Sequence, residues 1–209
     1  MSKSILQLRD VIISLQGKRL VDINQRVAAG EILTVMGPSG SGKSTLLAYI
    51  AGFISPAFQA SGAVLIDGAD ITTRPAELRQ IGLLLQDPLL FPHLSIGGNL
   101  RFALPKESSN KSELIQQGLD EIGLSGFEER DPGTLSGGQQ SRVALLRLLL
   151  SAPRAVLLDE PFAKLDTELR QVIRNLVFDK LRSSGLPTIL VTHDQADAEA
   201  AGGVIHTLA

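Results

Sequence analysis

Apolar residues in the first part of the chain recur in short runs that predict strands. The runs ILQL, VIISL and LVDI lie within residues 1–30, and turns such as QGKR separate them. Short apolar runs bounded by charged or glycine-bearing turns are typical of antiparallel β structure. Further runs predict strands at 31–36 (EILTVM), 63–67 (AVLID) and 81–86 (IGLLLQ). The N-terminal part of the chain is therefore expected to be rich in strands.

The spacing of apolar residues becomes helical in the middle of the chain. From Asp87 to about Ser151 the pattern predicts helices near SIGGNLRFAL, near KSELIQQGLDEIGL and after Ser136. We interpret this stretch as a helical insert. The apolar residues expected to face inward in the last two helices are Leu114, Ile115, Leu119, Ile122, Val143, Leu146 and Leu150.

The last part of the chain alternates between strand and helix patterns. AVLLDEP at 155–161 predicts a buried strand, TELRQVIRNLVFDKLRSS at 167–184 an amphipathic helix, and TILVTH at 188–193 another strand. GVIHTLA at 203–209 is expected to add an edge strand. This alternation predicts an α/β fold with a mostly parallel sheet.

Composition and charge narrow the classes of function. The chain has 209 residues, which suits one compact domain. A formal net charge of -2 excludes a polyanion such as DNA as the main partner, so we expect no nucleic acid. The absence of cysteine excludes disulfides and thiolate metal sites. The most apolar stretch is interrupted by Arg147, Pro153 and Arg154, and no signal peptide is recognisable, so we expect no membrane crossing and no secretion.

The stretch GPSGSGKST fits the phosphate-loop pattern G-x-x-x-x-G-K-[ST] and stands between a predicted strand and a predicted helix. Its glycines allow backbone N–H groups to turn toward phosphate, Lys43 neutralises β and γ oxygens, and Ser44 offers a hydroxyl to Mg²⁺. The alternative is a glycine-rich turn with a solvated lysine, which the flanking elements disfavour. The expected nucleotide-binding residues are Gly37, Pro38, Ser39, Gly40, Ser41, Gly42, Lys43, Ser44 and Thr45.

Two carboxylates end the predicted strand AVLLDEP. Successive side chains of a strand leave on opposite faces, so Asp159 and Glu160 are expected to serve different purposes. We assign Asp159 to the Mg²⁺ shell and Glu160 to the general base that activates water. The alternative is an acidic strand end stopped by Pro161.

The stretch LSGGQ at 135–139 predicts a helix start with a capping box, in which Ser136 and Gln139 satisfy each other's backbone amides. A plain helix cap is the simplest interpretation. Glycines at 137 and 138, however, weaken the first turn by about 1 kcal/mol each relative to alanine. Close approach of an anion to the bare backbone would explain them.

Taken together, these motifs resemble those of the nucleotide-binding subunits of ATP-binding cassette (ABC) transporters, and the likeness covers nearly the whole chain. It implies one ABC ATPase domain over 1–209, with a P-loop NTPase core, an N-terminal antiparallel β subdomain and a helical signature subdomain. The core with its β subdomain is expected at 1–86 and 152–209, and the helical subdomain at 87–151. ATP and Mg²⁺ are the implied ligands.

The resemblance also implies roles for residues that are ambiguous alone. Two subunits dock head to tail, so that Ser136, Gly137, Gly138 and Gln139 cap the γ-phosphate bound by the partner subunit. Gln86 matches a residue of the Mg²⁺ and water shell, His193 a switch histidine at the γ-phosphate, and Asp166 an aspartate at the dimer seam. Without the resemblance, Gln86 and His193 would be ordinary polar strand ends. The implied catalytic residues are Lys43, Gln86, Glu160 and His193, and the implied metal ligands are Ser44, Gln86 and Asp159.

The sequence departs from the family pattern at two places: the residue that stacks on the nucleotide base, and the loop at the dimer interface. Relatives place an aromatic residue near the N-terminus to stack on adenine, but no Phe, Tyr or Trp precedes Tyr49. We expect Leu15 to provide an apolar platform instead, with weaker affinity or looser base selectivity. Lys164 brings a cation to the seam, either paired or pointing outward.

The stretches QDPLLFPHLSIGGNL and DEPFAKLD are similar to those of importers of small nutrients. They imply a polytopic permease partner, a substrate-binding protein and a peripheral location on the cytoplasmic side of the inner membrane. Residues 91–94 are expected at the permease contact, or else in a buried loop. No C-terminal regulatory domain is expected. Alternatives are a nucleotide-gated regulatory module with little hydrolysis, and an exporter ATPase.

Overall fold

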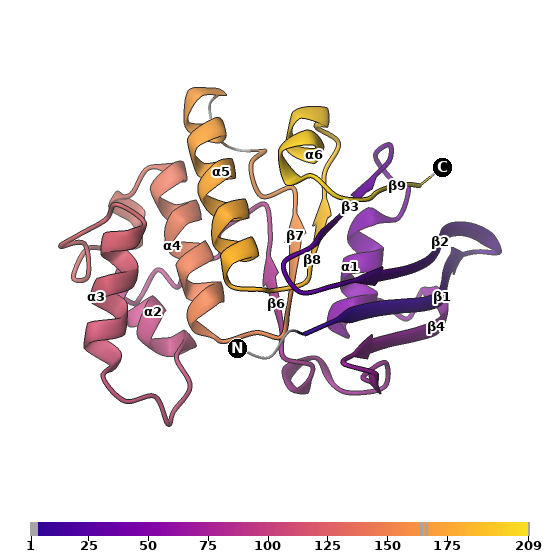
Figure 1. Cartoon of the computed structure of the whole chain (residues 1–209), viewed down its shortest axis with the longest axis horizontal. Coiled ribbons are helices and arrows are strands. Elements are labelled where there is room, and N and C mark those ends of the chain that lie inside the picture. The colour runs from indigo at the N-terminus through magenta and orange to yellow at the C-terminus, as the bar shows by residue number, and fades with distance from the viewer. Residues whose placement is uncertain (1–3, 164, 166, 209) are drawn as a thin grey trace. The chain divides into compact units, whose positions relative to one another are not determined.

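The computed structural model describes residues 4–163, 165 and 167–208 (Figure 1). The chain divides into two compact units. The first contains the described residues up to Leu83, Arg154–Glu160 and those from Phe178 onward. The second contains Leu84–Pro153 and the described residues between Pro161 and Val177.

An antiparallel sheet forms the N-terminal part of the first unit, as predicted. A two-residue turn at Gln16 and Gly17, both with positive φ, reverses the chain between its first two strands. ILQL and VIISL are not separate strands, because they join in one strand with an irregularity between Arg9 and Ile12. An added Cβ at Gly62 would lie 2.3 Å from the Asp10 carbonyl oxygen, so only glycine fits opposite that irregularity. The strands, in sheet order, are β2 (Lys18–Val27), β1 (Leu6–Leu15), β4 (Phe58–Ile66) and β5 (Ala69–Asp70).

The second sheet contains the short, continuously apolar strands of the core. All of its pairings that involve β3 or β8 are parallel, as the alternation of strands and helices predicted. The predicted edge strand at the end of the chain is present as β9, whereas the run IGLLLQ stops being a strand at Leu84. The strands, in sheet order, are β6 (Ile81–Leu84), β7 (Ala155–Asp159), β8 (Thr188–Val191), β3 (Ile32–Met36) and β9 (Ile205–Thr207).

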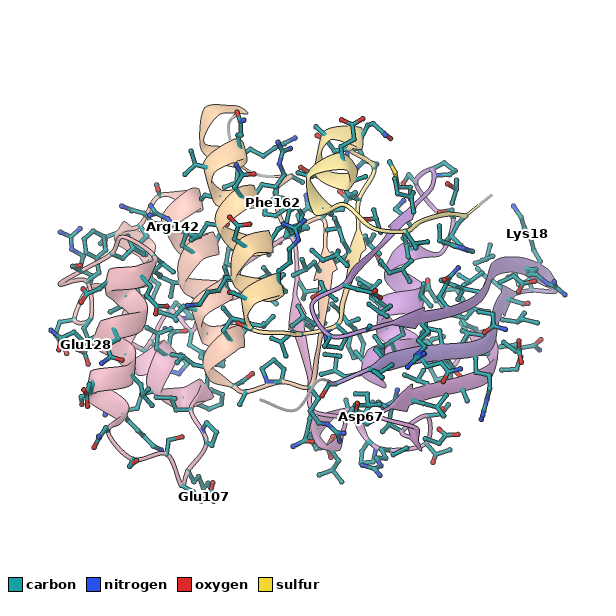
Figure 2. The ribbon with its side chains drawn as sticks, viewed as in Figure 1. Lys18, Asp67, Glu107, Glu128, Arg142 and Phe162 are labelled. Atoms are coloured by element: carbon teal, nitrogen blue, oxygen red, sulfur yellow. The ribbon has the colours of Figure 1, made fainter. Side chains whose placement is uncertain are left out.

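A single cluster of buried apolar side chains joins the two sheets and helix α1 (Lys43–Ala51) in the first unit. Its members come from both sheets and include Leu6, Ile13, Leu46, Leu157 and Ile189. Asp67, in the turn after β4, accepts hydrogen bonds from the Arg154 guanidinium (2.5 Å) and the Ile5 amide (2.7 Å) (Figure 2). The two sheets of the first unit are therefore held together by a shared apolar cluster, and the hydrogen bonds of Asp67 add a polar link.

Helices make up the second unit, and the three predicted between Asp87 and Ser151 are present. These are α2 (Ile96–Ala103), α3 (Lys111–Glu121) and α4 (Gly137–Leu150), and α5 (Thr167–Ser183) runs from this unit into the first. An added Cβ on Gly118 of α3 would lie 2.6 Å from Leu146 Cδ1 of α4, so glycine permits close packing of the two helices. The prediction that Leu114 faces inward is wrong: it is 38% exposed, whereas Ile115 and Leu119 are buried.

One further helix, α6 (Gln195–Ala201), was not predicted from the sequence. Its residues QADAEAA offer few apolar side chains for a periodic pattern. The start is set by Asp194, whose carboxylate accepts hydrogen bonds from the Ala196 and Asp197 amides. The helix packs near β3 and so belongs to the first unit.

Candidate nucleotide-binding site

The phosphate loop leaves the carboxyl end of β3, an interior strand of the parallel sheet, and enters α1. Gly40 and Gly42 have φ values of 81° and 97°, which favour glycine. An added Cβ at Gly42 would lie 3.0 Å from Val21 Cγ2 and 3.1 Å from Leu20 Cβ. The glycine therefore lets the loop lie directly against strand β2.

The lysine of the loop curls back over it. Lys43 is 8% exposed, and its Nζ donates to the carbonyl oxygens of Gly37 and Pro38, both at 2.8 Å. The buried Ser41 hydroxyl has no hydrogen-bond partner in the described part of the chain. A confined ammonium, an unsatisfied hydroxyl and the N-terminus of α1 together suit an anionic group. The loop therefore fits the phosphates of a nucleotide.

Asp159 ends strand β7 beside the first turn of α1. The Ser44 hydroxyl donates to its Oδ1 at 3.3 Å. Burial raises the pKa of the Asp159 carboxyl above its ordinary value, while the Ser44 hydrogen bond lowers it, the Glu160 carboxylate raises it and Lys43 lowers it. One carboxylate and one hydroxyl are a donor set that suits Mg²⁺, which keeps several waters and binds substrate phosphates.

Glu160 and His193 form a pair at the same end of the sheet. Glu160 Oε1 lies 3.0 Å from His193 Nδ1, and the two side chains are 25% and 66% exposed. Strand β7 ends before Glu160, whose φ is 46° and whose amide donates to the Val191 carbonyl. Glu160 thus lies just beyond the end of the strand in a left-handed backbone conformation, where strand alternation no longer applies.

A cavity of about 630 Å³ in the first unit is shared by the phosphate loop, Glu160 and His193. The apolar part of its lining consists of Leu15, Leu20 and Phe58. Leu15, the predicted platform, is therefore part of the cavity lining, but Phe58 was not singled out from the sequence. No local pattern marks it, because its place depends on the pairing of β1 with β4.

The second glycine motif begins helix α4 in the second unit. The predicted capping box is present: the Gln139 amide donates to Ser136 Oγ (3.3 Å), and Gln139 Oε1 accepts from the Ser136 amide (3.0 Å). An added Cβ at Gly137 would meet nothing within 4 Å. Arg142 Nη1 donates to the Ile122 carbonyl at the end of α3 (2.7 Å), which anchors the helix (Figure 2).

The remaining candidate residues are not among those that line this cavity. Gln86 is exposed in a bend after β6, within the second unit. Asp166 and Lys164 lie outside the described residues. Among residues 4–163, 165 and 167–208, no group of three or more His, Cys, Asp or Glu is placed to hold a metal ion.

An exposed aromatic patch on the second unit includes part of the predicted permease contact. Phe91 and Phe102 meet edge to face with ring centroids 4.9 Å apart, and Phe102 and Leu89 are 70% and 61% exposed. Arg147 supports the loop below by donating to the carbonyl oxygens of Pro88 and Leu89, both at 2.9 Å. We call Leu89, Phe91 and Phe102 the aromatic patch. Phe102 was not singled out from the sequence.

Comparison with known proteins places the sequence among the ATP-binding proteins of ABC transporters. The sequence profile of a family described as "ABC transporter" matches residues 20–163. An uncharacterized ABC transporter ATP-binding protein, YnjD of Escherichia coli K12, is 42% identical over 204 residues, which cover 96% of this chain and 94% of that protein.

No helix in the described part of the chain is long and apolar enough to cross a bilayer.

Importer components are also similar to the chain. The spermidine/putrescine import ATP-binding protein PotA of Mesoplasma florum is 40% identical across 95% of this chain. The Fe(3+) ions import ATP-binding protein FbpC of Escherichia coli O157:H7 is 36% identical across 97%. The chain spans 57% of the length of the first of these and 59% of the second.

Proposed function

The chain belongs to the ABC transporter family as an ATP-binding ATPase, and from this premise we propose that it hydrolyses Mg·ATP in a head-to-tail dimer and thereby drives a separate membrane permease. The observation that carries the proposal is the single cavity shared by the phosphate loop, Glu160 and His193. Phosphate binding and water activation would then occur at adjoining positions.

The residues of the cavity divide the chemistry among themselves. Lys43 and the loop amides would hold the β and γ phosphates, and Ser44 and Asp159 would hold Mg²⁺, which would supply charge neutralisation there. Glu160 would accept the proton of the attacking water, and His193, whose Nδ1 lies 3.0 Å from Glu160 Oε1, would orient that carboxylate and contact the γ-phosphate. Gln86 is assigned to the same metal and water shell.

The signature helix supports the dimer. The N-terminus of α4 presents Ser136 and Gly137, both exposed, and the capping box leaves other first-turn amides free. Because nothing in the described chain contacts the position of a Gly137 Cβ, the glycine meets no internal packing need. We assign Ser136, Gly137, Gly138 and Gln139 to the γ-phosphate of the partner subunit's nucleotide, with Asp166 at the seam.

The aromatic patch supports a permease partner. A T-shaped pair of rings left at the surface of a helical unit is typical of a protein interface. Since relatives are named as spermidine/putrescine and Fe(3+) importers, we propose import of a small cationic solute with the help of a substrate-binding protein. The chain would act peripherally at the cytoplasmic face of the inner membrane.

A hydrolysis-deficient variant tests the proposal. Glu160→Gln is expected to reduce ATP turnover at least about a hundredfold, because the amide cannot accept the proton, and to accumulate a Mg·ATP-bound dimer. Light scattering after size exclusion measures the dimer, and phosphate release measures turnover. Lys43→Ala is the control, since loss of phosphate binding removes both signals. A variant that stays monomeric with saturating Mg·ATP, alone and with the permease, contradicts the proposed dimer.

A further inference from the structure

Three apolar side chains, which we call the apolar wall, form part of the cavity lining. Leu15 and Leu20 come from β1 and β2, and Phe58 is the first residue of β4. Leu15 and Phe58 face each other across the antiparallel pair of β1 and β4. Both are partly buried, and Leu20 and Phe58 pack against the main apolar cluster, so the wall is supported from behind.

This apolar wall packs directly against the phosphate loop. Gly42 packs so closely on Leu20 that an added Cβ would approach Leu20 Cβ to 3.1 Å. A triphosphate on the loop leaves the rest of its nucleotide to occupy the remainder of the same cavity, whose apolar lining consists of Leu15, Leu20 and Phe58. A purine base is flat and apolar on its faces, and it stacks more favourably on a phenyl ring than on an aliphatic chain.

We propose that Phe58 is the residue on which the nucleotide base stacks, and that Leu15 and Leu20 only border it. This inference rests on the proposed function, because the position of the base follows only if the triphosphate binds to the phosphate loop. It revises the expectation that the chain lacks an aromatic platform: the ring is supplied by β4 instead of the segment around Leu15. Phe58 is the only phenyl ring among the described residues that line the cavity.

The chemistry of the wall also sets the base selectivity. The side chains of Leu15, Leu20 and Phe58 carry no hydrogen-bond donor or acceptor, so they contact the face of a base and do not read its edge. Stacking is tolerant of base identity because every base has a π-face. ATP and GTP are therefore expected to bind with dissociation constants within about threefold of each other, and both more tightly than inorganic tripolyphosphate.

Two substitutions at the same position test the proposal by binding alone. Phe58→Leu keeps an apolar side chain and is expected to weaken ATP and GTP binding about five- to tenfold in calorimetry, with tripolyphosphate binding unchanged. Phe58→Trp places one indole in a chain that has no tryptophan, and its fluorescence is expected to respond to ATP and GTP but not to tripolyphosphate. Phe53, 56% exposed and outside the cavity lining, provides the matched controls Phe53→Leu and Phe53→Trp, which are expected to show neither effect.

Each outcome decides between explanations. Unchanged ATP affinity in Phe58→Leu, or a Phe58→Trp signal that tripolyphosphate elicits equally, overturns the stacking role while leaving the proposed function intact. An equal loss of ATP and tripolyphosphate binding also overturns it, since the residue would then be structural. If the unmodified chain binds neither ATP nor tripolyphosphate, the proposed function itself fails.

Discussion

Asp159 meets opposing demands at the scale of one residue. Its assigned role needs an ionised carboxylate, but burial raises its pKa, and the Ser44 hydrogen bond offsets that effect only in part. In the nucleotide-free chain the ionised form is therefore disfavoured by folding. A bound cation would offset the free-energy cost of ionising the buried Asp159 carboxyl. Functional residues often lower stability in this way.

Replacing Asp159 by asparagine is expected to raise the melting temperature of the nucleotide-free chain at neutral pH. Since the folded pKa lies above the unfolded one, the penalty exists above the folded pKa and disappears as the pH falls through it toward 3.8. Thermal unfolding at pH values from neutral down toward 3.8 is the measurement. Over the same range, Mg²⁺-dependent ATP binding by the unmodified chain is expected to weaken as the pH falls.

Asp70 provides a control of opposite sign. Hydrogen bonds from the Thr72 hydroxyl and amide lower the pKa of Asp70, so its ionised form stabilises the fold above the unfolded pKa and this contribution is lost as the pH falls through the folded pKa. Asp70→Asn is thus expected to lower the melting temperature at neutral pH. If Asp159→Asn lowers it as well, desolvation does not govern Asp159.

At the scale of one element, helix α1 is fixed at both ends. Its N-terminus carries Lys43, and its C-terminus is capped by the buried guanidinium of Arg79, which donates to the carbonyl oxygens of Tyr49 and Ile50, both at 2.8 Å. Gly52 follows with a φ of 94°, and an added Cβ there would lie 2.5 Å from Arg79 Nε. The glycine and the arginine together satisfy the last carbonyls of the helix.

Arg79→Met is expected to reduce the free energy of unfolding by about 3 kcal/mol, because it leaves several buried carbonyls without donors. Urea unfolding followed by circular dichroism measures the change. Arg19→Met, which removes an exposed ion pair with Asp22, is the control and is expected to change it by less than about 0.5 kcal/mol. A loss below about 1 kcal/mol for Arg79→Met would show that water satisfies the helix end.

At the scale of the whole molecule, the two units contain different candidate sites. The first holds the nucleotide cavity, and the second holds the aromatic patch and the signature helix. Asn99, fully buried in α2, donates to the Phe91 carbonyl and accepts from its amide, so the patch rests on a satisfied polar support. The patch can therefore be altered without disturbing the cavity.

Phe102→Ser combined with Leu89→Ser is expected to abolish co-purification with the permease and permease-stimulated ATP turnover. Because both side chains are mostly exposed, the melting temperature and the ATP dissociation constant are expected to stay unchanged. Val172→Ser removes another exposed apolar side chain from the second unit and is expected to affect none of these quantities. Retention of the permease by the double variant would place the contact elsewhere.

The sequence by itself determined the features that depend on neighbouring residues. The strand, loop and helix around GPSGSGKST and the capping box of Ser136 and Gln139 lie as predicted. The turn predicted in QGKR is present but confined to Gln16 and Gly17, because β2 starts at Lys18. Their backbone angles and hydrogen bonds are set within a few residues, so local chemistry suffices. The helical insert and the edge strand β9 were predicted for the same reason.

Only the tertiary structure decided which distant residues meet. Strand register brings Phe58 opposite Leu15, packing turns Leu114 outward, and a left-handed backbone at Glu160 sets its direction. Arg79 reaches the end of α1 through the fold and not through any helix pattern. Such contacts depend on pairing between segments far apart in the chain, where one-residue shifts exchange faces, and no short window of sequence contains that information.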